Sequence, residues 1–333
     1  MKAPISPKLL ALVFASLLLL DVCVQAAGRE DSEEATFTTI DFPHATSTAP
    51  RDISAAGEIV GRYDSAADGN THGFLRSKDG EFTTIDVPGA VFSVAAGINA
   101  RGDIVGWYRL TANAVTHGFL LSRGTFTTID FPGTTITQLN GINSRGDIVG
   151  RRCPFLPCGR GAHGFLLSRG EFTSIDVPGA LDEIHAWKIN DRGQIVGGYA
   201  GADGKNHVFL LRKGEFTTID FSVTIAINFT GGISPGGDIV GVYCDSATCM
   251  FGSTDLHGFL LSRGVIRGEF TTIDVPGATW TAAFGINGCG DIAGTYIDTN
   301  GKQHGFLLSR KEEDEDDLGS LCRTDWNTFK TQR

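Results

Sequence analysis

One pentapeptide recurs through the whole chain and constrains its fold more than any other feature. Phe-Thr-Thr-Ile-Asp, or a one-letter variant of it, occurs six times, at steps of 45, 44, 46, 44 and 54 residues. The copies start at Phe37, Phe82, Phe126, Phe172, Phe216 and Phe270. Self-similarity at a nearly fixed period indicates a repeat architecture. A residue present in every copy is therefore expected to build the repeat, and candidates for function are expected among residues that differ between copies.

Each unit contains four short extended segments. In the second unit they are residues 93–99, 103–108, 117–122 and 125–131, which are rich in Val, Ile, Thr and Phe. Gly and Pro mark their ends, so these segments are predicted to be strands. The turn from Asn99 to Asp103 predicts a bulged hairpin, with Gly102 in the left-handed conformation. The Ser-Arg-Gly turn at 122–124 is expected to follow the same logic.

The strands carry apolar side chains on both faces, as in Ile59-Val60-Gly61-Arg62-Tyr63. A sheet of this kind must be covered on both sides, which a β-propeller achieves by packing identical sheets around an axis. The repeats begin with a fourth-type segment, 37–42, and end with a third-type segment, 304–309. The sequence therefore predicts an all-β, six-bladed β-propeller of four-stranded blades, the last blade closed by the N-terminal strand. A linear β-solenoid is the rival architecture.

The N-terminal residues have the features of a secretory leader. Lys2 and Lys8 precede an apolar run, residues 9–20, and the small-residue site Val24-Gln25-Ala26 follows. We expect a signal peptide over residues 1–26 and a secreted, extracellular or periplasmic protein. A lipid anchor at Cys23 is the weaker alternative. No other stretch is long and apolar enough to predict a membrane span.

The charge distribution argues against some classes of partner. The formal net charge is −10, and residues 311–317 contain six acids and one Lys. The absence of a basic stripe in the sequence argues against nucleic acid and anionic membrane surfaces as partners. Residues 36–310 are predicted to form the propeller. Residues 311–333 are predicted to be an acidic, disordered tail.

Six of the seven cysteines lie beyond the leader, and export makes disulfides plausible. Cys153 and Cys158 enclose four residues, as do Cys244 and Cys249, at the same place in two units. A local disulfide in each loop is predicted, and the remaining two cysteines, Cys289 and Cys322, would then pair. Zinc is the alternative, but the spacing lacks the usual C-x2-C knuckle. No metal site and no cofactor are predicted.

The order of short motifs within each unit is specific. Gly-Ile-Asn, Gly-Asp-Ile-Val-Gly, His-Gly-Phe-Leu and the pentapeptide follow one another over residues 36–310. This arrangement resembles the HAF-repeat family of bacterial repeat proteins, which are regarded as extracellular. The resemblance implies an exported repeat protein. It implies no activity, and no catalytic residue is carried over.

Two polar residues recur in every unit. The histidines are His72, His117, His163, His207, His257 and His304, and the pentapeptides end in Asp41, Asp86, Asp130, Asp176, Asp220 and Asp274. A structural role is predicted for both sets, with hydrogen bonds from each His to nearby polar groups. Some of these aspartates are hypothesised to be the acceptors.

One stretch, which is expected to connect two blades, departs from the repeat most clearly. It contains Asp182, Glu183, His185 and Trp187, and Trp280 lies in the matching stretch of the sixth unit. Two indoles with carboxylates and a His suit a sugar or another polar organic ligand, so these five residues are the candidate binding residues. The alternative is that both tryptophans fill gaps between blades.

The sequence supports three functional hypotheses. The first is a secreted, monomeric propeller that binds a protein or glycan ligand, possesses no catalytic residues and catalyses no reaction. The second is an extracellular polysaccharide hydrolase or lyase with two facing carboxylates, and the third is a structural protein of the cell envelope. No nucleophile elbow, His-Glu-x-x-His helix or phosphate loop occurs in the sequence.

Overall fold

The computed structural model describes residues 35–112, 115–156, 158, 161–219, 226–244, 256–262 and 269–310. These residues form 24 β-strands and no helix, so no helix among them could span a membrane. They belong to one compact unit, residues 35–327. A second unit comprises 1–34 and 328–333. The predicted signal peptide, 1–26, and the predicted tail, 311–333, lie outside the described residues.

The strands fall into four classes by their place in a sheet. The first strands are β2 (Ala45–Ile53), β6 (Phe92–Ile98), β10 (Ile136–Ile142), β14 (Ala180–Ile189), β18 (Ala226–Ile233) and β22 (Trp280–Ile286). The second strands are β3 (Ile59–Ser65), β7 (Ile104–Arg109), β11 (Ile148–Cys153), β15 (Ile195–Gly201), β19 (Ile239–Cys244) and β23 (Ile292–Ile297). The third strands are β4 (Thr71–Arg76), β8 (His117–Ser122), β12 (His163–Ser168), β16 (Asn206–Arg212), β20 (Leu256–Ser262) and β24 (Gln303–Arg310). The fourth strands are β5 (Phe82–Ile85), β9 (Thr125–Ile129), β13 (Glu171–Ile175), β17 (Glu215–Ile219), β21 (Glu269–Ile273) and β1 (Ala35–Ile40).

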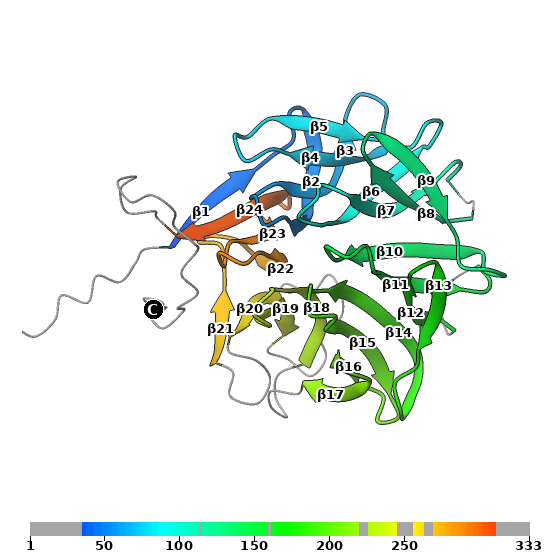
Figure 1. The fold of residues 1–333 in the computed structure, drawn as a ribbon. Coiled ribbons are helices and arrows are strands. Elements are labelled where there is room, and N and C mark those ends of the chain that lie inside the picture. The colour runs from blue at the N-terminus through cyan, green and yellow to red at the C-terminus, as the bar shows by residue number, and fades with distance from the viewer. Residues whose placement is uncertain are drawn as a thin grey trace, which may run out of the picture. The chain divides into compact units, whose positions relative to one another are not determined.

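The sheets repeat one antiparallel order. Four sheets have four strands each: β10–β13, β14–β17, β18–β21, and β22-β23-β24-β1. An eight-stranded sheet holds β2–β5 and β6–β9, which have the same internal order and are joined by one parallel pair, Thr71 and Phe92. The first strands surround the centre in Figure 1, and each contacts the first strands on either side, with β22 next to β2. The chain is an all-β propeller with four-stranded blades.

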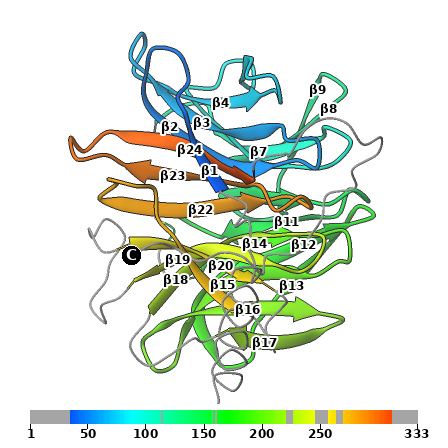
Figure 2. The ribbon, with the colours of Figure 1, turned by 90° about the vertical axis from the view of Figure 1, so that its left-hand side faces the viewer.

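The predicted pairing of the N-terminal segment with the last repeat is present. Strand β1 pairs antiparallel with β24, from Ala35 opposite Arg310 to Ile40 opposite Gly305. Figure 2 shows β1 beside β24, with β23 and β22 following. This antiparallel pairing leaves β24 with a neighbour on each side, so no long open edge remains there.

The Asn of each Gly-Ile-Asn motif links neighbouring sheets near the axis. Its amide Nδ2 donates to a backbone carbonyl of the next unit, as in Asn99 to Asn143 at 3.1 Å and Asn190 to Ser234 at 3.0 Å. The last unit is tied to the first in the same way, since Asn287 Nδ2 lies 3.5 Å from the carbonyl oxygen of Ser54. These hydrogen bonds explain why Asn recurs at this position of the repeat.

In the second unit the two hairpin turns differ in type. In the turn after the first strand, Asn99 Oδ1 accepts hydrogen bonds from the N–H groups of Arg101 and Asp103, and Gly102 has a φ of 77°. This is the bulged turn that the sequence predicts. The Ser-Arg-Gly turn is different, because Arg123 and Gly124 both have positive φ, 50° and 78°. A two-residue loop with two positive φ angles is a type I′ turn, whose twist suits the flanking strands.

The Phe of each His-Gly-Phe-Leu segment fills the core of its sheet. Phe119 is 1% exposed and packs edge-on against Phe126, with ring centroids 5.5 Å apart. It lies directly over Gly106, where an added Cβ would sit 2.8 Å from the ring. The same close approach occurs at Gly61, Gly150, Gly197 and Gly294. The Gly of Ile-Val-Gly therefore recurs because the ring occupies the space of a side chain.

Five of the six repeated histidines form the predicted hydrogen bonds, whereas Nδ1 of His163 has no hydrogen-bond partner among the described residues. In five units the His Nδ1 lies close to a carboxylate oxygen of the pentapeptide Asp: His72 and Asp86 (2.6 Å), His117 and Asp130 (2.7 Å), His163 and Asp176 (3.5 Å), His257 and Asp274 (2.9 Å), His304 and Asp41 (2.9 Å). Burial opposes the charge on His72, but Asp86 and Asp68 outweigh it and raise its pKa. In the remaining unit His207 Nε2 lies 3.0 Å from Asp203, and Asp220 is outside the described residues. Within the described ranges, no group of three or more His, Cys, Asp or Glu side chains is arranged to hold a metal ion.

The predicted disulfide between Cys153 and Cys158 is present. It closes the loop after β11, and Cys153 packs with Ile136 and Ala162 in a small buried cluster. Cys244 is also disulfide-bonded, and so is Cys289. Their predicted partners, Cys249 and Cys322, lie outside the described residues, so those two pairings stay predictions.

Candidate functional site

One residue in each first strand is left without a partner in the second strand. The register of every first pair shifts by one residue at this place, which makes a β-bulge. The bulged residues are Arg51, Ala96, Asn140, Trp187, Gly231 and Phe284. A bulge re-aims the side chain that it carries. Here all six residues line the same cavity, which we call the axial cavity.

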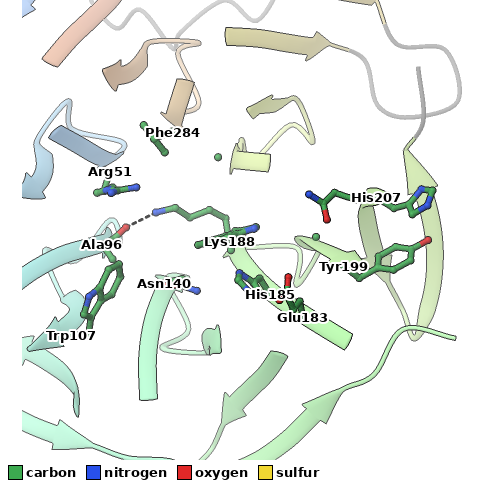
Figure 3. Close-up of a pocket in the computed structure, with 14 residues that line it drawn as sticks. Arg51, Ala96, Trp107, Asn140, Glu183, His185, Lys188, Tyr199, His207 and Phe284 are labelled. Carbon is green, nitrogen blue, oxygen red and sulfur yellow. Dashed lines mark hydrogen bonds between the residues drawn. The ribbon is translucent and has the colours of Figure 1, made fainter. Parts of the chain in front are cut away.

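The axial cavity has a volume of about 300 Å³. Besides the bulged residues, its lining includes Glu183 and His185 near the start of β14, and Asn206 and His207 at the start of β16. It therefore lies on the side of the sheets where one blade leads to the next and where second and third strands connect. Figure 3 shows the lining side chains gathered from several sheets around this space.

An ion pair lies at the bottom of the cavity. The residue after the bulge is Gly97, Gly141, Gly232 or Gly285 in four units, but Asp52 in β2 and Lys188 in β14. Lys188 Nζ lies 2.8 Å from Asp52 Oδ2, with 9% and 13% of the two side chains exposed. Because β2 and β14 are not neighbours in the ring of first strands, this pair spans the axis.

The ion pair is further held by the backbone. Lys188 Nζ donates to the carbonyl oxygen of Ala96 at 2.6 Å (Figure 3), and Asp52 accepts from the N–H groups of Ile98 and Ile53. Burial raises the pKa of Asp52 and lowers that of Lys188, while each partner opposes the shift of the other. A buried charge left without its partner would be costly, so the two residues depend on each other.

A second, smaller cavity of about 90 Å³ lies on the other side of the ion pair. It is lined by the Ile and Asn residues of the Gly-Ile-Asn motifs, including Ile98, Asn99 and Asn143, and it shares Lys188 with the axial cavity. The Asp52–Lys188 pair therefore separates two spaces along the axis.

Arg51 contributes a positive charge to the axial cavity. Its guanidinium carbon lies 4.7 Å from the centroid of the Phe284 ring, a cation–π contact. Its Nε is buried and has no hydrogen-bond partner, and no described residue forms an ion pair with it. Burial and the nearby charge of Arg62 lower the pKa of Arg51 to about 10, so the guanidinium remains protonated at neutral pH.

Asn140 offers an unused acceptor. The residue is 3% exposed, and its Nδ2 donates to the carbonyl oxygen of Ala186 at 2.9 Å. Its Oδ1 is buried and has no hydrogen-bond partner. Buried amide oxygens are nearly always bonded, so this one marks a place where a ligand donor would be favourable.

His185 is held neutral. Its ring packs edge-on against Trp187 at 5.0 Å between centroids, and its Nε2 lies 3.4 Å from Arg151 Nη1. Burial and the Arg151 charge lower the pKa of His185 to about 3. Because Nε2 faces a donor, the proton belongs on Nδ1. A neutral imidazole in this position contributes a hydrogen-bonding edge and no charge to the cavity.

The structure brings three of the predicted site residues together and leaves one apart. Glu183, His185 and Trp187 line the axial cavity, whereas Trp280 packs on the buried cluster around Val242 and does not line it. Trp187 packs against the same cluster, so it serves both the interior and the cavity. Glu183, His185 and Trp187 were expected in a connection between blades, but they lie within strand β14.

The backbone of β14 explains this difference. The register shifts between Asp182 and His185, and Glu183 has a φ of 59°, so the strand is irregular where a loop was expected. Glu183 is exposed at this irregularity. The side chain of Asp182 lies outside the described part of the chain. The role of the five predicted residues in binding stays a prediction.

Sequence reasoning missed four residues of the site: Arg51, Asn140, Lys188 and Phe284. Arg51, Asn140 and Phe284 occupy the repeat position of Trp187, immediately before the Gly-Ile-Asn motif or its variant. Reading that one position across all six units would have found them. Lys188 replaces the Gly of that motif and was visible as a departure from the repeat in the same way.

Comparison with known proteins identifies the fold. No protein-family model matches the chain, and no curated protein sequence matches it. Among solved structures it is similar to AofleA from Arthrobotrys oligospora, with a TM-score of 0.51 and 13% identity over 84% of this chain and 88% of that chain. It is also similar to a protein assigned as TolB from Agrobacterium tumefaciens, with a TM-score of 0.51 and 15% identity over 80% of this chain and 90% of that chain. At such identities the likeness concerns the fold alone.

Proposed function

We propose that the chain is an exported, six-bladed propeller that binds a small polar organic ligand, a glycan unit, in the axial cavity. Six blades follow if β2–β5 and β6–β9 are counted separately, since a single parallel residue pair joins their strands into one sheet. The Cys153–Cys158 disulfide fits an oxidising compartment. The predicted leader and the resemblance to the HAF-repeat family are consistent with export.

The observation that carries the proposal is the variety of the bulged residues. Equivalent positions that only built the fold would repeat one residue, as the motifs elsewhere in the chain do. Instead this ring presents an indole, a phenyl ring, a guanidinium and an amide to one cavity. Flat apolar faces combined with a few oriented polar groups are typical of ligand sites. Aromatic faces also suit the apolar side of a sugar ring.

The proposal is tested by titrating the purified chain with a panel of mono- and oligosaccharides in a calorimeter. We expect Trp187→Ala to weaken binding of any ligand found by about tenfold or more, since buried aromatic residues carry much of the energy at binding sites. Trp280→Ala is the matched control, because it removes an indole that does not line the axial cavity.

Two results would reject this function. One is a Trp187→Ala variant that folds normally and binds its ligand as tightly as the parent chain. The other is the absence of binding to any sugar of the panel at millimolar concentration. Near-ultraviolet circular dichroism shows whether each variant keeps its tertiary packing.

A further inference from the structure

Arg51 is a cation without a counter-ion in the axial cavity. Lys188 is paired with Asp52, and Arg151, beside the cavity, has the charge of Glu183 nearby. No described acidic group forms an ion pair with Arg51, and the charges that it interacts with are positive: Arg62 lowers the pKa of Arg51, and Arg51 lowers the pKa of Lys188. Charges shielded from water are normally paired. An anionic group on a ligand would supply what the protein does not.

The position of Arg51 in the backbone keeps it available. It is the bulged residue of β2, so its side chain is aimed at the axis and is not paired across the sheet. Two of the other bulged residues, Ala96 and Gly231, are small and leave space in the ring. Figure 3 shows the nitrogen ends of Arg51 and Lys188 directed to the same part of the cavity.

The other polar groups describe the rest of the ligand. The Lys188 ammonium has three N–H groups, and the contacts with Asp52 and with the carbonyl oxygen of Ala96 use two of them. The unpartnered Oδ1 of the buried Asn140 accepts a hydrogen bond and so requires a donor such as a hydroxyl. A carboxylate fits the planar fork of a guanidinium better than a spherical anion does. Arg51, Lys188 and Asn140 together therefore favour a ligand that carries both a carboxylate and a hydroxyl group.

Because the chain as a whole is acidic, attraction for an anionic ligand has to arise from residues inside the cavity. With a formal net charge of −10, the protein as a whole repels anions. Glu183, an exposed carboxylate of the cavity lining, adds to that repulsion at the rim. Affinity for an anionic ligand must then come from the buried end of the cavity, where Arg51 lies.

We infer that the axial cavity binds a sugar acid, with the carboxylate of a hexuronate paired to Arg51, a hydroxyl donating to Asn140 Oδ1 and the ring against Trp187. This inference rests on the proposed function and names the class of its ligand. The recognition needs no metal ion and no covalent step.

The experiment compares ligands that differ only in charge. The full chain is titrated with D-galacturonate and D-glucuronate, with the neutral parent sugars D-galactose and D-glucose, and with the methyl esters of the two acids. We expect at least one acid to bind about tenfold or more tightly than its own ester and its parent sugar, because charge-assisted bonds to a partly buried guanidinium are among the stronger ones. Acetate is included to separate a sugar acid from a simple carboxylate.

Variants assign the effect to Arg51. Arg51→Gln removes the charge but keeps a polar side chain, and it should reduce the preference for acid over ester to about twofold or less. Arg152→Gln is the matched control: the Arg152 guanidinium also lies over a phenyl ring, Phe131 at 4.3 Å, and its Nε is also unpartnered, but it does not line the cavity. If Arg51→Gln does not fold, the comparison of acid with ester on the parent chain still tests whether the cavity prefers a carboxylate.

The outcomes separate this inference from the function on which it rests. Equal binding of acid, ester and neutral sugar would overturn the inference and leave the binding function standing. Binding of acetate as tight as that of the uronates would overturn the sugar-acid class. If the parent chain binds none of these compounds nor any sugar of the wider panel, the proposed function fails and the inference fails with it.

Discussion

At the scale of single residues, the side chains that line the axial cavity stand where the repeat is broken. The position before the Gly-Ile-Asn motif varies freely, and the Gly of that motif gives way to Asp52 and Lys188 in two units. Elsewhere the Gly allows close packing of first strands, since a Cβ on Gly97 would lie 3.0 Å from Gly141 Cα. The side chains of Asp52 and Lys188, which replace this Gly, meet across the axis.

The Asp52–Lys188 pair gives a sharp prediction for stability. Lys188→Gly should lower the free energy of unfolding by about 3–5 kcal/mol, because it leaves Asp52 buried without its partner. The double variant Asp52→Gly/Lys188→Gly places the commonest residue of the repeat at both positions. It should recover at least half of that loss. Urea unfolding of the parent, both single variants and the double variant measures the coupling energy between Asp52 and Lys188. If the losses in unfolding free energy of the two single variants simply add in the double variant, the account is contradicted.

The residue scale also shows the limit of reading this sequence. Trp187 and its neighbours were visible because they differ from other units at a matched position. The contact between Asp52 and Lys188 was not, since it depends on which two sheets face each other across the axis. The absence of an acidic partner for Arg51 was hidden for the same reason.

At the scale of the strand, sequence motifs map closely onto structure. In the second unit the four predicted segments became Phe92–Ile98, Ile104–Arg109, His117–Ser122 and Thr125–Ile129, within two residues at each end. Prediction was reliable here because Gly and Pro end the strands and local turn chemistry sets their register. The bulge that re-aims the cavity residues has no such local signal, so it could not be read from one unit.

Strand packing predicts that the Gly of Ile-Val-Gly tolerates no side chain. Gly106→Ala should cost on the order of 2–3 kcal/mol, because the new Cβ would lie 1.9 Å from the Val94 carbonyl oxygen and 2.8 Å from the Phe119 ring. Gly288→Ala is the control, since the nearest atom to its Cβ would be 3.7 Å away. Its effect should stay within about 0.5 kcal/mol. Equal losses in chemical denaturation would show that the ring contact is not the reason for the glycine.

At the scale of the whole molecule, the site depends on closure of the ring. Its bulged residues belong to every unit from Arg51 in β2 to Phe284 in β22, so the cavity has a wall from the first unit and a wall from the last. The bonds that join these units include the β1–β24 pairing and the Asn287–Ser54 link. Closure was predictable from the order of segment types at the two ends of the repeat region. The chemistry inside the ring was not.

Hydrogen–deuterium exchange followed by mass spectrometry tests this closure most directly. The peptide covering β1, Ala35–Ile40, is compared with the one covering β13, Glu171–Ile175, which is the equivalent fourth strand of an internal sheet. The account predicts that both peptides are protected on the same timescale, within about tenfold, because both strands are paired along a third strand. Exchange of β1 at the rate of an unfolded peptide, with β13 still protected, would contradict the closed ring and remove the basis of the axial site.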